Sequence, residues 1–486
     1  MRKPDLKVSV SIIYVAAMFM SIMDSTIVNV ALPSIGRQLN VATTSIDAVV
    51  VGYLVSLAVV IPASGWLGDR LGTKRIFLAA LALFSLASAL CGIAPSFPML
   101  VLFRILQGAA GGAMTPVGAA ILYRTFPPAE RVQVSRILII PTVAAPAVGP
   151  VLGGLLVDQL SWRWVFYVNV PIGIAAFLFG LAFLHEHKEP AAGHLDVKGF
   201  LLAGIGLALL MYALSEGAST GWASPRILAS LIIGTLLLAA FVIIDLRERE
   251  PLIDLRLLGN RIFRACNLIS LFSGAGFLGI LFIAPLFLQE ARGVDALTSG
   301  LTTFPEAIGV VLSTQLVARL YPRIGPRRLM VFGITGVAIV MALLSLIGMG
   351  TNLWFMRLLM FLTGAGMAYS FLPLQTAAYA TISRSATGRA TAFYSAQRQL
   401  GSALGVAILS SVLTAIGPVQ FSAHGIPTPN LTAYHAAFLA AAVLELIAAA
   451  FALTVHDRDA AATMLRPGKS VEQGDVLEEV PQVVAD

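Results

Sequence analysis

Long apolar segments recur along the whole chain, and they constrain its fold more than any other feature. Each is roughly 20 residues long, the length of α-helix that crosses the hydrocarbon core of a bilayer. Because backbone polar groups inside a bilayer must bond to one another, such segments predict transmembrane helices. We expect fourteen spans, over residues 10–32, 46–67, 76–94, 97–122, 136–157, 164–184, 199–215, 227–244, 265–288, 298–318, 329–348, 353–380, 390–416 and 433–455.

The composition supports this all-α integral membrane class. Hydrophobic residues make up 58% of the chain and charged residues only 12%, against roughly 45–50% and 25% in average soluble domains. A soluble fold of 486 residues could not cover its surface with so few charges. The two cysteines, Cys91 and Cys266, lie in or beside predicted spans, so no disulfide framework is implied.

The positive charge is distributed unevenly along the chain. The pI is about 9.6, yet most of the 32 Lys and Arg residues lie in the N-terminal segment, the even-numbered loops and the tail. This bias is the positive-inside rule, so we expect a multi-pass protein of the cell membrane with both termini in the cytoplasm. Topology then explains the basic charge, and we expect no nucleic-acid partner. The exceptions are Arg37, Arg163, Arg226 and Arg292 in the opposite loops, and Arg104, Arg357 and Arg398 within spans.

The chain repeats itself at an offset of 253 residues. Residues 70–75 correspond to residues 323–328, and Arg104, Gly111 and Met114 of the fourth span have counterparts in the twelfth. Two matches at one spacing indicate duplicated six-helix bundles, and the seventh and eighth spans form an insert between them. Parallel halves around a midplane site are typical of transporters. We predict bundles at 1–185 and 265–456, an insert with a cytoplasmic connector at 186–264, and a disordered tail at 457–486.

Asp24 lies inside the first predicted span, where lipid disfavours a carboxylate by ~3 kcal/mol or more. Burial disfavours the charged form of a carboxyl group, so a proton can bind and leave near neutral pH. A proton-coupled carrier needs such a group. The alternative is a structural carboxylate that is hydrogen-bonded by neighbouring helices.

Two more acidic residues lie well inside spans of the second bundle. Glu306 follows Pro305, which would kink its helix, and is a candidate second proton site or cation-recognition site. Glu445 has no local motif, and we treat it as a candidate for the lining of a cavity.

Arg104 and Gln107 lie one turn apart on one face of the fourth span. A buried Arg stays charged and would favour the ionised form of a nearby carboxyl group, so Asp24 and Arg104 form a plausible proton switch. The alternative is that Arg104 bonds to backbone carbonyls around nearby glycines. Both roles are compatible.

The fifth span contains Gly149 and Gly153, which form a small-residue face that another helix can approach closely. Pro150 removes a backbone hydrogen bond and bends the span, and Gly154 follows. A single pair of glycines at this spacing is common where membrane helices pack together. Together with Pro146, it suggests a bending point for alternating access.

Five segments resemble signatures of the major facilitator superfamily, in particular its fourteen-helix drug:proton antiporter branch. The run 65–75, GWLGDRLGTKR, is similar to the loop signature of the superfamily, and 104–108, RILQG, resembles its fourth-span motif. The run 149–154 is similar to a motif associated with antiporters. The segment 23–33, MDSTIVNVALP, resembles the first-span signature of the branch, as does the segment around Trp162, Asn169 and Pro171. The resemblance covers nearly the whole chain except the acidic tail.

The resemblance implies a major facilitator fold and assigns roles to single residues. Asp69 would lock the outward-facing state across the loop that also contains Gly65 and Gly72, with Arg70 and Arg75 in the same charge relay. Asp24 and Arg104 would carry proton coupling, and the 149–154 helix would seal one bundle against the other. Asn29 and Gln107 are candidates for the cavity lining. Ala48 stands where many relatives have Trp, and Pro322 replaces the acid in the second loop, which leaves that loop basic.

The function expected from these residues is secondary antiport. Protons would enter while a hydrophobic or amphipathic compound, preferably a cation, leaves by alternating access. An exporter of an endogenous metabolite or lipid is the alternative, and an integral membrane enzyme a distant one. We expect a monomer in the lipid bilayer that uses protons and a small-molecule substrate, with no cofactor and no metal. The chain has no phosphate-binding GxxxxGK[ST] motif, which disfavours ATP-driven transport.

Overall fold

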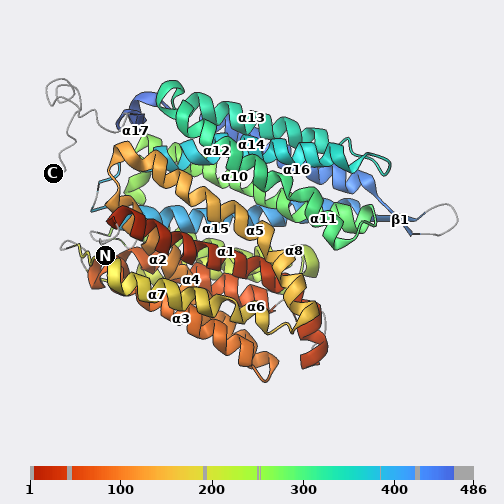
Figure 1. Cartoon of the computed structure of the whole chain (residues 1–486), viewed down its shortest axis with the longest axis horizontal. Helices are drawn as coiled ribbons and strands as arrows, with labels where there is room; N and C mark the ends of the chain where they lie inside the picture. Colours follow the sequence, from red (N-terminus) through yellow and green to blue (C-terminus); the bar gives the residue numbers. More distant parts are fainter. Residues whose placement is uncertain are drawn as a thin grey trace.

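The protein is a bundle of long helices that run roughly parallel to one axis (Figure 1). The computed structural model describes residues 5–40, 46, 48–189, 194–248, 251, 253–383, 385–421 and 427–464. Thirteen helices within these residues are long and apolar enough to cross a bilayer. The 29-residue helix α5 stands where the sequence predicts the span 136–157. The predicted all-α class is confirmed.

The first half of the chain forms one group of packed helices. In this group α1 contacts α4, α5 and α7, while α2 and α3 both contact α4. The sixth predicted span is divided at Val168, which separates α6 from α7. The bounds are α1 Leu6–Leu39, α2 Ala48–Leu71, α3 Thr73–Ile93, α4 Phe97–Thr125, a 3₁₀ turn Pro128–Glu130, α5 Arg131–Gln159, α6 Trp164–Tyr167 and α7 Asn169–Phe183.

The second half forms a corresponding group on the other side of the molecule (Figure 1). Here α10 contacts α14, α15 and α16, while α12 and α13 both contact α14. The tenth predicted span is divided at Phe304, just before Pro305. The bounds are α10 Arg261–Leu286, a π-turn Phe287–Ala291, α11 Ala296–Thr303, α12 Pro305–Ile324, α13 Pro326–Leu344, α14 Leu353–Ala378, α15 Thr387–Ile416 and α16 Leu431–Ala452.

Two further long helices, α8 (Val197–Thr220) and α9 (Pro225–Asp245), lie between these groups in the sequence. They pack on each other, and α8 also contacts α2 and α15, one helix from each group. The inserted pair therefore lies beside the seam between the bundles. A 3₁₀ turn at Leu255–Gly259 leads from α9 into α10.

The two ends of the molecule are distinguished by their short elements. At one end, here called the terminal end, α1 begins and the short helix α17 (Ala461–Met464) follows a 3₁₀ turn at Asp457–Ala460. At the opposite end, here called the hairpin end, β1 (Val419–Phe421) pairs antiparallel with β2 (Pro427–Pro429). Gln420 lies opposite Thr428 in this hairpin.

The tight turns α2–α3 and α12–α13 show the internal repeat directly. Gly72 and Gly325, 253 residues apart, both have positive φ, +112° and +85°, which a residue with a Cβ rarely adopts. An acid from elsewhere caps each following helix. Glu186 accepts from the Lys74 amide at 3.0 Å, and Asp457 accepts from the Arg327 amide at 2.9 Å.

The prediction of a disordered tail from residue 457 is wrong for its first residues. Asp457 caps α13, and the hydroxyl groups of Thr463 and Tyr321 lie 2.8 Å apart. These contacts hold residues 457–464 against the second bundle, because they satisfy a helix N-terminus and a buried hydroxyl. Residues 465–486 lie outside the described part of the chain.

Close packing between helices depends on crowded glycines, and substitution of a crowded and of an uncrowded glycine can be compared. A Cβ at Gly309 would lie 2.2 Å from the Phe361 carbonyl oxygen, whereas a Cβ at Gly336 would meet nothing within 4 Å. We predict that Gly309→Ala forces α12 and α14 apart and lowers the free energy of unfolding by about 1–3 kcal/mol. Gly336→Ala should leave stability unchanged or slightly higher. Thermal unfolding of both purified variants checks this, and equal melting temperatures would contradict it.

Candidate functional site

Asp24 lies in the middle of the first bundle, and none of its surface is exposed to solvent. Its Oδ2 atom accepts a hydrogen bond from Arg104 Nη1 at 2.5 Å. Its Oδ1 atom accepts from Gln107 Nε2 at 2.9 Å and from Asn169 Nδ2 at 2.8 Å. The carboxylate is thus satisfied by one cation and two amides from α4 and α7.

Ser88, on α3, joins these donors in a second layer. Its hydroxyl accepts from Gln107 Nε2 and from Asn169 Nδ2, each at 3.1 Å, and donates to the Phe166 carbonyl at 2.9 Å. Ser88, Gln107 and Asn169 are all fully buried. One continuous polar network therefore ties together α1, α3, α4 and α7 inside an apolar bundle, where each bond is strengthened by the low dielectric.

Arg104 is fully buried, and its guanidinium group contacts neighbouring groups on several sides. Its Nε donates to the Val49 carbonyl at 3.2 Å, and Nη1 also donates to Gln107 Oε1 at 2.8 Å. The Tyr53 ring centroid lies 4.2 Å from the guanidinium carbon, close enough for a cation–π contact. Arg104 is thus the predicted partner of the carboxylate, while its backbone acceptor lies on α2 and not around the glycines of α4 as the alternative expected.

The buried charges of Asp24 and Arg104 depend on each other. A buried ion pair is held together by its mutual attraction, and removal of one charge leaves the other uncompensated. Proton uptake by Asp24 would remove the negative charge and weaken its bonds to Arg104, Gln107 and Asn169. The site can therefore couple one proton to the packing of four helices.

Sequence reasoning found only part of the network. It proposed Asp24 and Arg104 as a pair, and the structure brings them together. Gln107 was expected at a cavity lining, but it lies in this buried network instead. Ser88 was missed, because one small polar residue among the alanines and leucines of α3 carries no pattern that separates it from ordinary packing.

A second charged contact lies at the terminal end. Asp69, near the end of α2, accepts from Arg124 Nη2 of α4 at 2.8 Å. The expected relay through Arg70 and Arg75 is not present: Arg75 lies 3.6 Å from Glu186 instead, and Arg70 is exposed. Arg70 follows Asp69 on α2 and therefore points about 100° away around the helix, and Arg75 belongs to the next helix, α3. Arg124, twenty residues along the helix from Arg104, was not predicted.

The two bundles meet closely at this end. A Cβ on Gly65 would lie 2.6 Å from the Gly388 carbonyl oxygen, and a Cβ on Gly388 would lie 2.5 Å from Asp69 Oδ2. The Asp69 carboxylate therefore rests on the first turn of α15, in the second bundle. Arg131 donates to the Tyr379 carbonyl, which is a further contact across the seam.

More contacts across the seam lie beside these. The Thr376 and Ser135 hydroxyls form a hydrogen bond at 2.8 Å. The ring of Tyr123 lies 4.3 Å from that of Tyr379 across the seam, and Tyr394 of the second bundle packs behind Tyr379, with ring centroids 5.8 Å apart. Charged, polar and aromatic groups from both bundles thus close the seam at the terminal end.

The glycine face of α5 packs within the first bundle. A Cβ at Gly149 would meet Thr26 at 2.2 Å, and one at Gly153 would meet Ile27 at 2.9 Å, both on α1. Gly154 faces open space, and the Pro150 side chain lies outside the described part. The expectation that this face seals one bundle against the other is wrong for this structure, because α1 occupies it.

The remaining candidates do not join the Asp24 network. Asn29 is exposed on α1, roughly 140° around the helix from Asp24. Glu306 is buried in the first turn of α12, and its backbone oxygen packs against Gly364. Glu445 is fully buried against Gly276 of α10. Within the described residues neither glutamate forms an ion pair.

A chain of bilayer-length helices in two repeated bundles, with a buried ion pair in one of them, has the features of a multi-pass membrane transporter. Comparison with known families identifies the family of the chain. The model of the Major Facilitator Superfamily matches residues 14–406 and 266–474. The chain belongs to this family, and it is a transporter and not an enzyme.

Curated relatives cover most of the chain. It is 33% identical to the putative multidrug resistance protein MdtD of Yersinia pestis (strain Pestoides F), over 87% of this chain and 89% of that protein. It is 32% identical to the multidrug resistance protein B homolog of Mycobacterium tuberculosis (strain CDC 1551 / Oshkosh), over 82% of this chain and 75% of that protein.

Solved structures show the same fold at low sequence identity. The human organic anion transporter MFSD10 superposes with a TM-score of 0.64 at 16% identity, covering 93% of this chain and all of that one. The proton:xylose symporter XylE has a TM-score of 0.63 at 16% identity, covering 92% of this chain and 94% of that one. The predicted family and the predicted fold are confirmed.

The buried pair yields a prediction about stability. Arg104→Gln should destabilise the protein by about 3–5 kcal/mol, because it leaves the Asp24 carboxylate buried without a charge partner. The double variant Asp24→Asn, Arg104→Gln should recover much of this loss. Arg357→Gln is the matched control, since Arg357 is half-buried over the Trp354 ring. Thermal unfolding of the wild type, the single variants Asp24→Asn and Arg104→Gln, the double variant and the control tests the pair, and additive effects of the two substitutions would refute it.

The seam yields a prediction about turnover. Asp69→Asn removes the charge that bonds to Arg124 and rests on α15, so it should slow transport several-fold by weakening closure at the terminal end. Substrate binding should persist, because the substitution is confined to the seam at the terminal end. Transport rate and equilibrium binding are measured on the same preparation, and loss of binding together with transport would point to a misfolded loop.

Proposed function

We propose that the protein is a proton-coupled antiporter that exports hydrophobic or amphipathic compounds, preferably cations, from the cytoplasm by alternating access. The observation that carries the proposal is the buried Asp24–Arg104 pair with its amide partners. The names of the curated relatives, which refer to multidrug resistance, support export of drugs. The antiporter-like run 149–154 supports exchange with protons.

The proposed coupling runs along α4. This helix carries Arg104 at mid-depth and Arg124 at the terminal end, about 30 Å apart at 1.5 Å per residue. Proton uptake by Asp24 releases Arg104 and lets α4 shift relative to α1 and α7. The same shift moves Arg124 away from Asp69, which opens the seam. Proton loss restores both contacts, so the protonation state of one site sets the accessibility of the other end.

We infer the orientation from the basic loops. Arg70, Lys74 and Arg75 lie at the adjoining ends of α2 and α3, and residues 323–328 supply three more arginines at the repeated turn. The positive-inside rule places this terminal end in the cytoplasm of a cell membrane. The closed seam then makes the present conformation one in which cytoplasmic access is blocked.

Glu306 is the proposed second acid of the cycle. It lies at the break between α11 and α12, and α12 contacts α5 across the seam. A carboxylate at a helix break between bundles can bind a cationic group of the substrate or a second proton. The proton is the only coupling ion in this scheme, and a single chain supplies both bundles.

The coupling residue is tested by Asp24→Asn in proteoliposomes. Asn keeps the shape and one acceptor oxygen but cannot release a proton, so efflux driven by an imposed pH gradient should fall at least tenfold while expression is retained. Glu216→Gln, on α8 and outside both contacts, is the control. A proton uncoupler should abolish wild-type efflux of cationic dyes. Unchanged efflux in Asp24→Asn would overturn the coupling role.

A further inference from the structure

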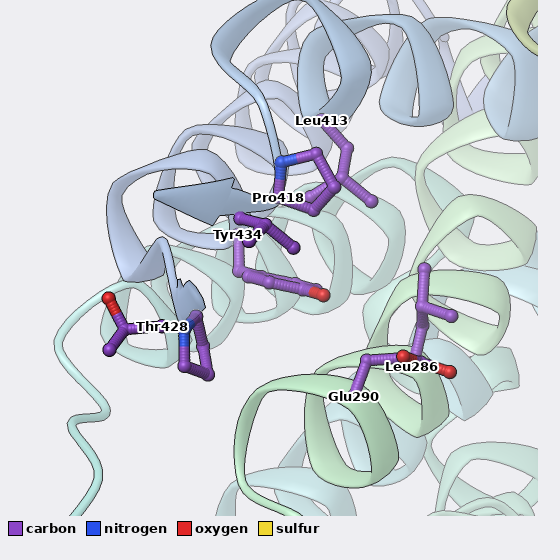
Figure 2. A pocket seen from close by; sticks show the side chains of 8 residues that line it. Leu286, Glu290, Leu413, Pro418, Thr428 and Tyr434 are labelled. Atoms are coloured by element: carbon purple, nitrogen blue, oxygen red, sulfur yellow. The ribbon is translucent and has the colours of Figure 1, made fainter. Parts of the chain in front are cut away.

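A pocket of about 360 Å³ opens at the hairpin end of the second bundle, away from the Asp24 network (Figure 2). Leu286 near the end of α10, Leu413 of α15 and Tyr434 of α16 form its helical walls, and Pro418 and Thr428 cover it from the β-hairpin. Its volume falls within the range of small-molecule sites, roughly 300–1,000 Å³.

Glu290 contributes the charged group of this pocket. It belongs to the π-turn Phe287–Ala291 that ends α10, in which the Arg292 amide bonds to the Phe287 carbonyl at 3.1 Å. Such wide turns are frequent at functional sites. In Figure 2 the Glu290 carboxylate and the Tyr434 hydroxyl lie on facing sides of the pocket.

The carboxylate of Glu290 is not neutralised by its basic neighbours. Arg292, two residues on, donates to the carbonyls of Met349 and Thr351 at 3.1 and 2.6 Å, so its guanidinium binds the α13–α14 loop. His435, next to Tyr434, bonds to the Ile347 carbonyl at 2.8 Å. Within the described residues Glu290 has no ion pair, and it is the one charged residue that lines the pocket.

The walls complement this charge with apolar and aromatic surface. Tyr434 is held edge-on by the Phe287 ring, with centroids 5.6 Å apart, so its orientation is fixed. Only 2% of the Tyr434 surface is exposed, so its ring forms a rigid wall, while the exposed Glu290 carboxylate supplies the attraction for a cation. Leucine and proline side chains then bury the apolar part of the same ligand.

We propose that this pocket is a binding site for amphipathic organic cations, in which Glu290 holds the charge and the hairpin, the helix ends and the buried Tyr434 ring form the apolar walls. This deepens the proposed function, on which it rests: the hairpin end then faces outward, and the pocket is a site that an exported cation occupies at the mouth of the transporter.

The experiment measures the binding of an organic cation at the pocket itself. Cys91 and Cys266 are buried, so a single Gln420→Cys on the hairpin, opposite Thr428, can be labelled selectively with an environment-sensitive fluorophore. The purified full chain is titrated with tetraphenylphosphonium and with tetraphenylborate, an anion of the same shape. We expect a saturable fluorescence change with the cation only.

Single substitutions test which residues of the pocket bind the cation. Glu290→Gln should raise the half-saturating cation concentration about three- to tenfold, because it removes the charge but keeps the shape. Thr428→Trp should abolish the response by filling the pocket, and it keeps the site testable if Glu290→Gln fails to fold. Glu216→Gln, near the end of α8, should leave the response unchanged.

The outcomes separate this site from the transport mechanism. No saturable response to the cation, an equal response to the anion, or an unchanged half-saturating concentration in Glu290→Gln would overturn the pocket. Asp24→Asn should retain the fluorescence response while efflux is lost. A wild-type protein that responds at the hairpin but shows no proton-driven efflux would overturn the proposed function and leave the cation site standing.

Discussion

The buried ion pair between Asp24 and Arg104 is the interaction on which the first bundle depends. Neither group could remain in an apolar core alone, and each is surrounded by donors or acceptors that fix its geometry. The two amides and Ser88 add no charge, but they spread the polar network over four helices. The network therefore ties together helices that are far apart in the sequence.

The two bundles share an origin but use different chemistry. At the 253-residue offset, Tyr53, whose ring packs on Arg104, corresponds to Glu306. Arg104 itself corresponds to Arg357, which is half-buried beside Trp354 and not enclosed. The turns after α2 and α12 are alike in backbone and in their acid cap, whereas the interiors differ. The duplicated framework has kept its turns and lost the buried pair in the second half.

The seam between the bundles links the proposed proton site to the proposed exit. Asp69 touches both Arg124 of α4 and the first turn of α15, so the position of α4 is communicated to the second bundle. The same bundle carries the pocket at its hairpin end, bounded by α10, α15 and α16. A shift of α15 at the terminal end would therefore be felt by a wall of that pocket, since a helix moves largely as one body.

The sequence alone determined the membrane class, the repeat and the family, because these depend on apolar segment length and on local motifs. It also singled out Asp24 and Arg104, since charges inside spans are rare. Only the tertiary structure decided that Ser88 and Asn169 complete the network, that Arg124 and not Arg75 pairs with Asp69, and that α1 covers Gly149. The reason is physical: hydropathy gives the length of a helix but not its rotation, and contacts between helices depend on which face each one turns inward.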